Sequence, residues 1–193
     1  MVGVLALQGD FKKHGDILNN LKVDYLYVKD KKQLNRTDAL IIPGGESTAL
    51  SMLIDIADLR EDLVSYSKSK SIFGTCAGMI MLSSTENCDI KGCVDTLGVM
   101  NIKVSRNSWG AQIDSFEKNI DLKKFNIKSF NAIFIRAPKI TEIGKNIEKV
   151  DYLNEEAVLI DDGRHLACSF HPELDNDTRV HEYFLEKFYY GRK

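Results

Sequence analysis

The chain has 193 residues, with 26 Lys or Arg against 28 Asp or Glu, and a formal net charge of −2 at pH 7. Charges of both signs are interspersed, which argues against a nucleic-acid partner. The longest largely apolar stretch, residues 72–82, is far too short to cross a bilayer, so no membrane segment is expected. A chain of this length buries about 70% of its extended surface, so it can hold a core without disulfides or a metal. We expect a single domain over residues 1–193.

Cysteine usage points to a reducing compartment. The four cysteines stand at positions 76, 88, 93 and 168. Cys88 and Cys93 resemble a zinc half-site only loosely, and no second Cys or His pair follows at a suitable spacing, so no metal site is expected. The low cysteine count, and the absence of a basic region before the first apolar run, predict a cytoplasmic protein.

In the first half of the chain, apolar runs of strand length alternate with helical patterns. Strands that are apolar throughout favour a parallel sheet covered by helices on both faces, which is a doubly wound α/β fold. Asp10 is expected to cap the first helix. The predicted strands are 2–7, 23–28, 39–42 and 71–73, and the predicted helices carry Ile17, Leu18 and Leu21, run from Ser47 or Thr48 to Ile56, and cover 59–67 and 79–82.

The second half is less regular. We predict a loop at 109–110 and, at the end of the chain, a helix over 178–190 that packs on the sheet. The predicted strands are 102–104, 132–135 and a hairpin of 157–160 with 166–169. Active sites in doubly wound sheets lie beyond the carboxyl ends of the strands, which directs attention to the segments that follow them.

The segment Gly74-Thr75-Cys76-Ala77-Gly78 lies between a predicted strand and a predicted helix. G-x-C-x-G is the cysteine form of the nucleophile elbow, in which small residues allow a tight turn and the side chain at its tip projects from the fold. The N-terminus of a helix favours the thiolate, which is the nucleophilic form of cysteine. The alternative is a structural cysteine buried in a glycine-rich turn.

His171-Pro172-Glu173 follows the apolar strand at 166–169. Proline disfavours the helical conformation at the residue before it, and side chains two apart in an extended segment point to the same side. Glu173 is therefore expected to orient His171, which gives a Cys76–His171–Glu173 triad. The alternative is a surface turn. Of the other histidines, we expect His14 on a helix surface, His165 in the hairpin turn and His181 in the final helix, none of them beside a suitable acid at a strand end.

Pro43-Gly44-Gly45-Glu46-Ser47-Thr48 follows another predicted strand. Backbone N–H groups can approach a ligand closely at such glycines. The N–H groups of Gly45 and Ala77 could together form an oxyanion hole beside Cys76. The alternative is a plain strand-to-helix turn with Ser47 as the cap. No Lys follows the glycines, so the segment is not a Walker A motif.

Taken together, the ordered motifs resemble those of a known family. The chain is similar to the glutaminase subunits of pyridoxal 5′-phosphate synthase, which are class I, triad-type glutamine amidotransferases. The motifs that carry the resemblance are Leu5-Ala6-Leu7-Gln8-Gly9, Pro43–Thr48, Gly74–Gly78, Arg106-Asn107, Ser115-Phe116-Glu117, Phe134-Ile135-Arg136-Ala137-Pro138 and Ser169–Leu174.

The resemblance implies hydrolysis of L-glutamine to glutamate and ammonia through a glutamyl thioester on Cys76, with His171 as base and acid and with no cofactor. It implies that the ammonia passes to a (β/α)8-barrel synthase subunit, which combines it with a pentose phosphate and a triose phosphate. The glutamine-binding positions that it implies are Gly45, Glu46, Ser47, Arg106, Ile135 and Arg136.

One position departs from the family pattern: Ala111 stands where relatives commonly carry Arg. Three alternatives to the family function stay open, namely a glutaminase that serves another synthase, a cysteine peptidase and a non-catalytic regulatory module. Residues 8–14 are expected to form part of a docking surface, because they also follow a strand beside the proposed site.

Overall fold

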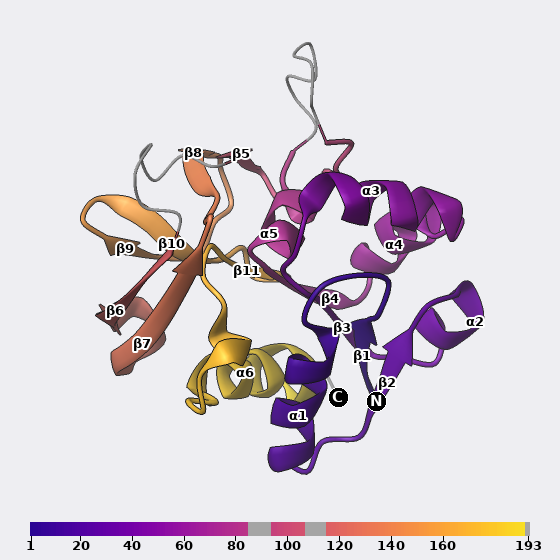
Figure 1. The fold of residues 1–193 in the computed structure, drawn as a ribbon, viewed down its shortest axis with the longest axis horizontal. Helices are drawn as coiled ribbons and strands as arrows, with labels where there is room; N and C mark the ends of the chain where they lie inside the picture. The colour runs from indigo at the N-terminus through magenta and orange to yellow at the C-terminus, as the bar shows by residue number, and fades with distance from the viewer. Residues whose placement is uncertain (85–93, 107–114, 192–193) are drawn as a thin grey trace.

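The computed structural model describes residues 1–84, 94–106 and 115–191. A seven-stranded sheet runs through its centre (Figure 1). In sheet order its strands are β2 (Tyr25–Val28), β1 (Val2–Leu5), β3 (Ala39–Ile42), β4 (Ser71–Thr75), β11 (Leu166–Cys168), β10 (Glu156–Asp161) and β9 (Lys149–Leu153). The five strands from β2 to β11 are parallel, and β10 and β9 extend the sheet in antiparallel fashion. The predicted mostly parallel α/β sheet is confirmed.

Helices cover both faces of the sheet (Figure 1). One face packs against α3 (Ser47–Ile56), α4 (Arg60–Ser67) and α5 (Ala77–Leu82), and the other against α1 (Phe11–Asn20) and α6 (Arg179–Phe184). Successive strand side chains point to opposite faces, so Val4 enters one apolar core and Leu5 the other. Three short elements complete the layers: α2 (Lys31–Leu34), η1 (Lys123–Phe125) and η2 (Pro172–Leu174).

Two antiparallel strand pairs flank the main sheet on the side of β9 and β10 (Figure 1). They are β5 (Ile102–Ser105) with β8 (Lys139–Ile143) and β6 (Ser115–Leu122) with β7 (Ile127–Ile135). The sequence predicted β5 and the end of β7, but it predicted neither β6, β8 nor β9. The end of β7 brings Ile135 and Arg136 to the edge where β4 and β11 end.

The predicted elements agree with the structure in type and differ mainly in their bounds. The predicted hairpin is formed by β10 and β11, and the last helix begins at Arg179 and continues as a π-helical segment over Leu185–Tyr190. Asp10 occupies the N-cap position of α1, but its side chain makes no capping hydrogen bond, contrary to the expectation. Its backbone carbonyl accepts from the N–H groups of Lys13 and His14 instead. The predicted loop at 109–110 lies outside the described residues.

None of the helices within the described ranges is both long and apolar enough to cross a membrane.

Candidate active site

Cys76 stands at a sharp turn between β4 and α5. Its backbone has φ 49° and ψ −104°, a combination that non-glycine residues rarely adopt and that is frequent at functional sites. The turn is held by a 2.9 Å hydrogen bond from the Cys76 N–H to the carbonyl of Cys168 on β11. Gly78 is required because a Cβ there would overlap the carbonyl oxygen of Ile42 on β3. The predicted strand, tight turn and helix are therefore present.

His171 follows β11, the strand that pairs with β4, and so reaches the same end of the sheet as Cys76. Its Nδ1 lies 2.7 Å from Oε1 of Glu173, and its backbone N–H donates to the carbonyl of Ile133. The expected contact with Glu173 is formed, but the expected extended backbone is not, since Pro172–Leu174 is a 3₁₀ turn. This turn brings the imidazole of His171 and the carboxylate of Glu173 together although the two residues are only two positions apart.

The imidazole of His171 and the side chain of Cys76 lie against the same glycine. A Cβ at Gly44 would overlap the ring of His171 and would lie 3.2 Å from the Cβ of Cys76. The other ring nitrogen, Nε2, is buried and has no hydrogen-bond partner among the described residues. Burial lowers the pKa of His171, but the side chains of Cys76 and Glu173 outweigh it and raise the pKa to about 10.

Two further histidines lie behind the carboxylate of Glu173. His14 of α1 is fully buried, with its Nε2 3.5 Å from Oε2 of Glu173, and its Nδ1 lies 2.9 Å from Nε2 of His181 on α6. The expectation of a surface position for His14, away from any acid, is wrong. The sequence carries a signal for its burial: Ile17, Leu18 and Leu21 follow it at intervals of three, four and seven, which places it on the apolar face of α1.

A cavity of about 280 Å³ opens beside Cys76 and His171. This volume lies slightly below the roughly 300–1,000 Å³ of most small-molecule sites and suits a small ligand. The six residues expected to bind the substrate all line it, namely Gly45, Glu46, Ser47, Arg106, Ile135 and Arg136. The sequence reasoning assigned no ligand contact to four further lining residues, Gly9, Asp10, Gly44 and Ile80. Two other predicted site residues do not line the cavity: Glu173, which lies behind His171, and Ala77, the first residue of α5.

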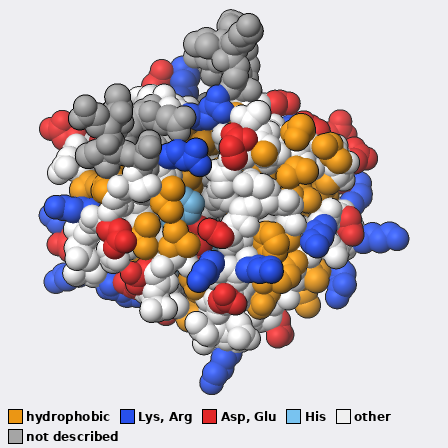
Figure 2. Space-filling model, viewed as in Figure 1, with side chains coloured by type: hydrophobic (Ala, Val, Ile, Leu, Met, Phe, Trp, Pro, Cys, Tyr) orange, Lys and Arg blue, Asp and Glu red, His pale blue; other side chains and the backbone are white. Residues whose placement is uncertain are grey.

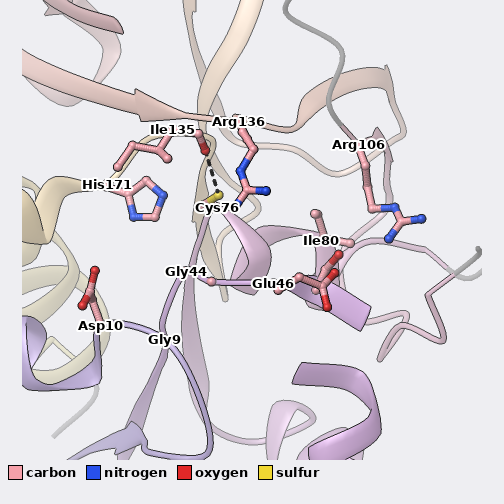
Figure 3. Close-up of a pocket in the computed structure, with 12 residues that line it drawn as sticks. Gly9, Asp10, Gly44, Glu46, Cys76, Ile80, Arg106, Ile135, Arg136 and His171 are labelled. Atoms are coloured by element: carbon pink, nitrogen blue, oxygen red, sulfur yellow. Dashed lines mark hydrogen bonds between the residues drawn. The ribbon is translucent and has the colours of Figure 1, made fainter. Parts of the chain in front are cut away.

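The close-up in Figure 3 shows Cys76 at the centre of this cavity, with His171 on one side and Arg136 on the other. The dashed contact joins the Cys76 sulfur to the carbonyl oxygen of Ile135, 3.9 Å away. In the space-filling view the hollow lies near the centre of the face, with acidic and basic side chains around it (Figure 2).

The Gly45–Glu46 turn forms the floor of the cavity. Gly45 has φ +146°, and a Cβ there would overlap the amide of Gln8. With its amide oriented to satisfy both groups, Gln8 donates to the Glu46 carbonyl (3.2 Å) and accepts from the Glu46 N–H (3.0 Å). The carboxylate of Glu46 caps α3 by accepting from the N–H groups of Thr48 and Ala49, so the alternative with Ser47 as the cap is wrong. Arg106 donates to the Thr48 hydroxyl (2.9 Å).

Comparison with known proteins identifies the family of this chain. The profile of the family described as "SNO glutamine amidotransferase family" matches residues 4–190. The chain belongs to the SNO glutamine amidotransferase family. A pyridoxal 5′-phosphate synthase subunit PdxT from Thermosipho africanus is 46% identical over 185 residues, covering 95% of this chain and 96% of that relative. The predicted family is therefore confirmed.

Solved structures agree with the family assignment. A crystal structure of a glutamine amidotransferase is 40% identical, with a TM-score of 0.87, and covers 96% of this chain and 97% of its own. The structure of PurLQS from Thermotoga maritima, at 14% identity, has a TM-score of 0.64 and covers 96% of this chain and 97% of its own. The second likeness shows a shared fold only.

The site of this family member combines a thiol at a tight turn, an imidazole oriented by a carboxylate and a rim with the exposed cations Arg106 and Arg136. Guanidinium groups suit the carboxylate of an amino acid. Among the described residues, no group of three His, Cys, Asp or Glu side chains is arranged to hold a metal ion. Cys88, Cys93, Asn107 and Ala111 lie outside the described residues.

Proposed function

We propose that this chain hydrolyses the side-chain amide of L-glutamine and supplies the ammonia for the synthesis of pyridoxal 5′-phosphate, which is vitamin B6. One observation carries the proposal: Cys76 and His171, which is ion-paired with Glu173 behind it, meet at the wall of one small cavity whose rim carries Arg106 and Arg136. The family, together with the relative named as a subunit of pyridoxal 5′-phosphate synthase, supports this function over the peptidase, the regulatory module and a glutaminase for another synthase.

In the first half of the reaction, the thiol proton of Cys76 passes to Nε2 of His171, and the sulfur attacks the carbonyl carbon of the amide. The N–H groups of Gly45 and Ala77 stabilise the negative oxygen that develops, as oxyanion holes do in acyl transfer. The proton on Nε2 of His171 passes to the departing nitrogen, the C–N bond breaks, and ammonia leaves a glutamyl thioester on Cys76. Glu173 stabilises the imidazolium and fixes the orientation of the ring.

In the second half, His171 is neutral and accepts a proton from water. The water oxygen attacks the thioester carbon, the C–S bond breaks, and the sulfur recovers its proton as glutamate leaves. The same imidazole therefore serves as a base and then as an acid in each half of the reaction. Glu46, Ser47, Ile135 and the two arginines hold the amino-acid end of glutamine at the rim in this proposal.

The proposal includes a partner. We assign the ammonia to a (β/α)8-barrel synthase subunit that binds this chain, in line with the name of the Thermosipho africanus relative. Residues 1–193 act as one glutamine amidotransferase domain, because Cys76 comes from the N-terminal half of the chain and His171 from the C-terminal half. A cytoplasmic location is part of the proposal, since Cys76 and Cys168 are both free thiols.

The test is glutamate release from L-glutamine, measured with and without the barrel subunit, for the wild type, Cys76→Ala and Cys168→Ala. Cys168 is a buried free thiol outside the cavity and serves as the matched control. We expect Cys76→Ala to lose at least about a thousandfold in kcat, because members of a catalytic unit act together. Cys168→Ala should stay within a few-fold of the wild type. Full activity in Cys76→Ala would refute the proposal, and cleavage of unfolded protein with no turnover of glutamine would favour the peptidase.

A further inference from the structure

A chain of buried polar side chains continues from the catalytic carboxylate into the protein interior. Oε1 of Glu173 is taken by His171. Oε2 is buried without a hydrogen-bond partner among the described residues and lies 3.5 Å from Nε2 of His14. Nδ1 of His14 lies 2.9 Å from Nε2 of His181, and Nε2 of His14 also lies 3.4 Å from the Thr75 hydroxyl. His14, His181 and Thr75 are each 0% exposed, and Glu173 is 3% exposed. No water can replace these contacts without entering the core.

The contacts of both rings allow a consistent arrangement of their protons. Burial is the main cause that lowers the pKa of His14, although the charge of Glu173 opposes it, and burial lowers the pKa of His181 to about 3. Both imidazoles are therefore neutral near pH 7, and each has one N–H donor. If the donor of His14 is Nε2–H, it faces the carboxylate, and Nδ1 accepts from Nε2–H of His181. The remaining nitrogen, Nδ1 of His181, has no partner among the described residues. In this arrangement it carries a lone pair and no proton, so no N–H donor is left unpaired.

The two helices that carry these histidines hold them closely. At Gly15, next to His14, a Cβ would overlap the hydroxyl of Tyr27 and lie 3.0 Å from the ring of Tyr25, so α1 packs tightly against β2. The ring of His181 packs edge-on against Phe73 of β4, with centroids 5.7 Å apart. In such a dry setting a hydrogen bond to a carboxylate is stronger than in water, and an unpaired carboxylate oxygen is more costly.

We infer that His14 is a positioning residue for the glutaminase reaction: through Nε2–H it fixes Oε2 of Glu173, and His181 fixes His14 in turn, so that α1 and α6 determine the orientation of His171. This inference rests on the proposed function. The N–O separation of 3.5 Å is long for a hydrogen bond, so the variants and the NMR measurement below test whether His14 acts on the carboxylate.

A neutral donor at this place has a specific consequence for pH. The groups that face His14 are Glu173, His171, His181, Thr75 and Asp10. A charged His14 would compete with His171 for the negative charge of Glu173, whereas a neutral His14 orients the carboxylate and leaves its charge to His171. Loss of the His14 donor should therefore shift the pH profile of kcat/KM as well as lower kcat.

A matched pair of substitutions separates positioning from packing. Gln places an amide N–H near the site of Nε2, and Met has similar length and volume but no donor. We expect His14→Met to lower kcat for glutamate release, with the barrel subunit present, by about 10- to 100-fold, the range for outer partners that orient metal-bound histidines. KM for glutamine should change by less than about threefold, since no rim residue is altered. His14→Gln should keep kcat within about fivefold of the wild type, and the control Asn19→Met, on the exposed face of α1, should match the wild type.

Two results with the variants would overturn the inference. One is a folded His14→Met enzyme with the kcat and pH profile of the wild type. The other is an equal loss in His14→Gln and His14→Met that follows their loss of thermal stability, which would mean packing alone. A third measurement needs no variant: nitrogen-15 NMR of the wild type should show His14 neutral with its proton on Nε2, and a proton on Nδ1 would refute the inference. An inactive wild type would count against the proposed function, while the NMR result would still decide the arrangement of His14.

Discussion

The two sides of the site differ in their exposure to water. Behind His171 lies a dry side, in which Glu173 is 3% exposed and His14 and His181 are 0% exposed. Across the cavity lies an open rim, where Glu46, Arg106 and Arg136 are exposed. Electrostatic interactions are strong on the dry side, because the interior has a low effective dielectric constant, and solvent weakens them at the rim. In the proposed function, the groups that move protons are therefore fixed by the core, whereas the groups that bind the amino acid are held at exposed positions.

The largest expected effect lies on the dry side. Replacing His171 with Gln removes both the acid for ammonia and the base for water, so kcat should fall by at least about a thousandfold, as for other members of catalytic units. KM for glutamine should change little, because the rim is intact. Steady-state glutamate release with the barrel subunit measures both constants. A variant that loses KM while keeping kcat would place His171 in recognition and erase the difference between the two sides.

Glu173→Gln should give the next largest loss, roughly 10²- to 10⁴-fold in kcat, by analogy with the amide replacement in the Ser-His-Asp triad. The amide keeps the shape of the side chain but removes the charge that supports the imidazolium of His171. Glutamate release at saturating glutamine measures this change. Unaltered kcat in a folded Glu173→Gln variant would contradict the role of the carboxylate.

The same pair predicts a dependence of stability on pH. The pKa of His171 is raised from 6.5 to about 10, so its stabilising contribution is complete below pH 6.5 and is lost as the pH rises toward 10. Urea unfolding between pH 6 and pH 10 should show the free energy of unfolding of the wild type falling more steeply than that of Glu173→Gln. Parallel curves for the two proteins would mean that Glu173 does not raise the pKa of His171.

At the rim the effect should move to KM. Arg136 lines the cavity and makes no hydrogen bond to another described residue, so its guanidinium is available to a ligand. A charge-assisted hydrogen bond is worth roughly 1.5–3 kcal/mol, so Arg136→Met should raise KM for glutamine about 10- to 150-fold. Initial rates over a range of glutamine concentrations test this, with kcat expected within a few-fold of the wild type. An effect confined to kcat would place Arg136 with the dry side.

The smallest effect concerns the cap of α3. Glu46→Ala removes the acceptor of the Thr48 and Ala49 N–H groups and should lower the free energy of unfolding by about 1 kcal/mol. Glu46→Asp, which can still cap, should lie within about 0.5 kcal/mol of the wild type. Burial raises the pKa of Glu46, but hydrogen bonds from Thr48 and Ala49 outweigh burial and leave the pKa below its usual value. The stability difference between the wild type and Glu46→Ala should therefore shrink as the pH falls through that lowered pKa. Urea denaturation at pH 7 and pH 3 measures both, and an equal loss in both variants at pH 7 would exclude the cap.

Much of the main sheet could be predicted from the sequence, because β1, β3 and β4 are buried on both faces and therefore read as continuous apolar runs. The strand β6 could not, since residues such as Lys118 and Asn119 face solvent and most of its length carries no apolar pattern. Its pairing with β7 is a long-range contact that no local signal specifies.

The candidate site was predictable where it depends on strand ends and missed where it depends on helix packing. Cys76 and His171 follow strands that a parallel sheet brings together, so their meeting follows from the fold. His14 was expected on a helix surface, although its spacing to Ile17 and Leu18 fits the buried face. Histidine is compatible with either position, and its partner Glu173 is so distant in the sequence that only the folded structure reveals the pair.

The most direct test of the central claim uses a diazoketone analogue of glutamine, which alkylates the nucleophile after binding where glutamine binds. The protein is treated with this analogue in the presence of the barrel subunit and mapped by peptide mass spectrometry. The account predicts one adduct, on Cys76, that excess glutamine prevents and that His171→Gln slows. An adduct on Cys168 or another residue while Cys76 stays unmodified would contradict it.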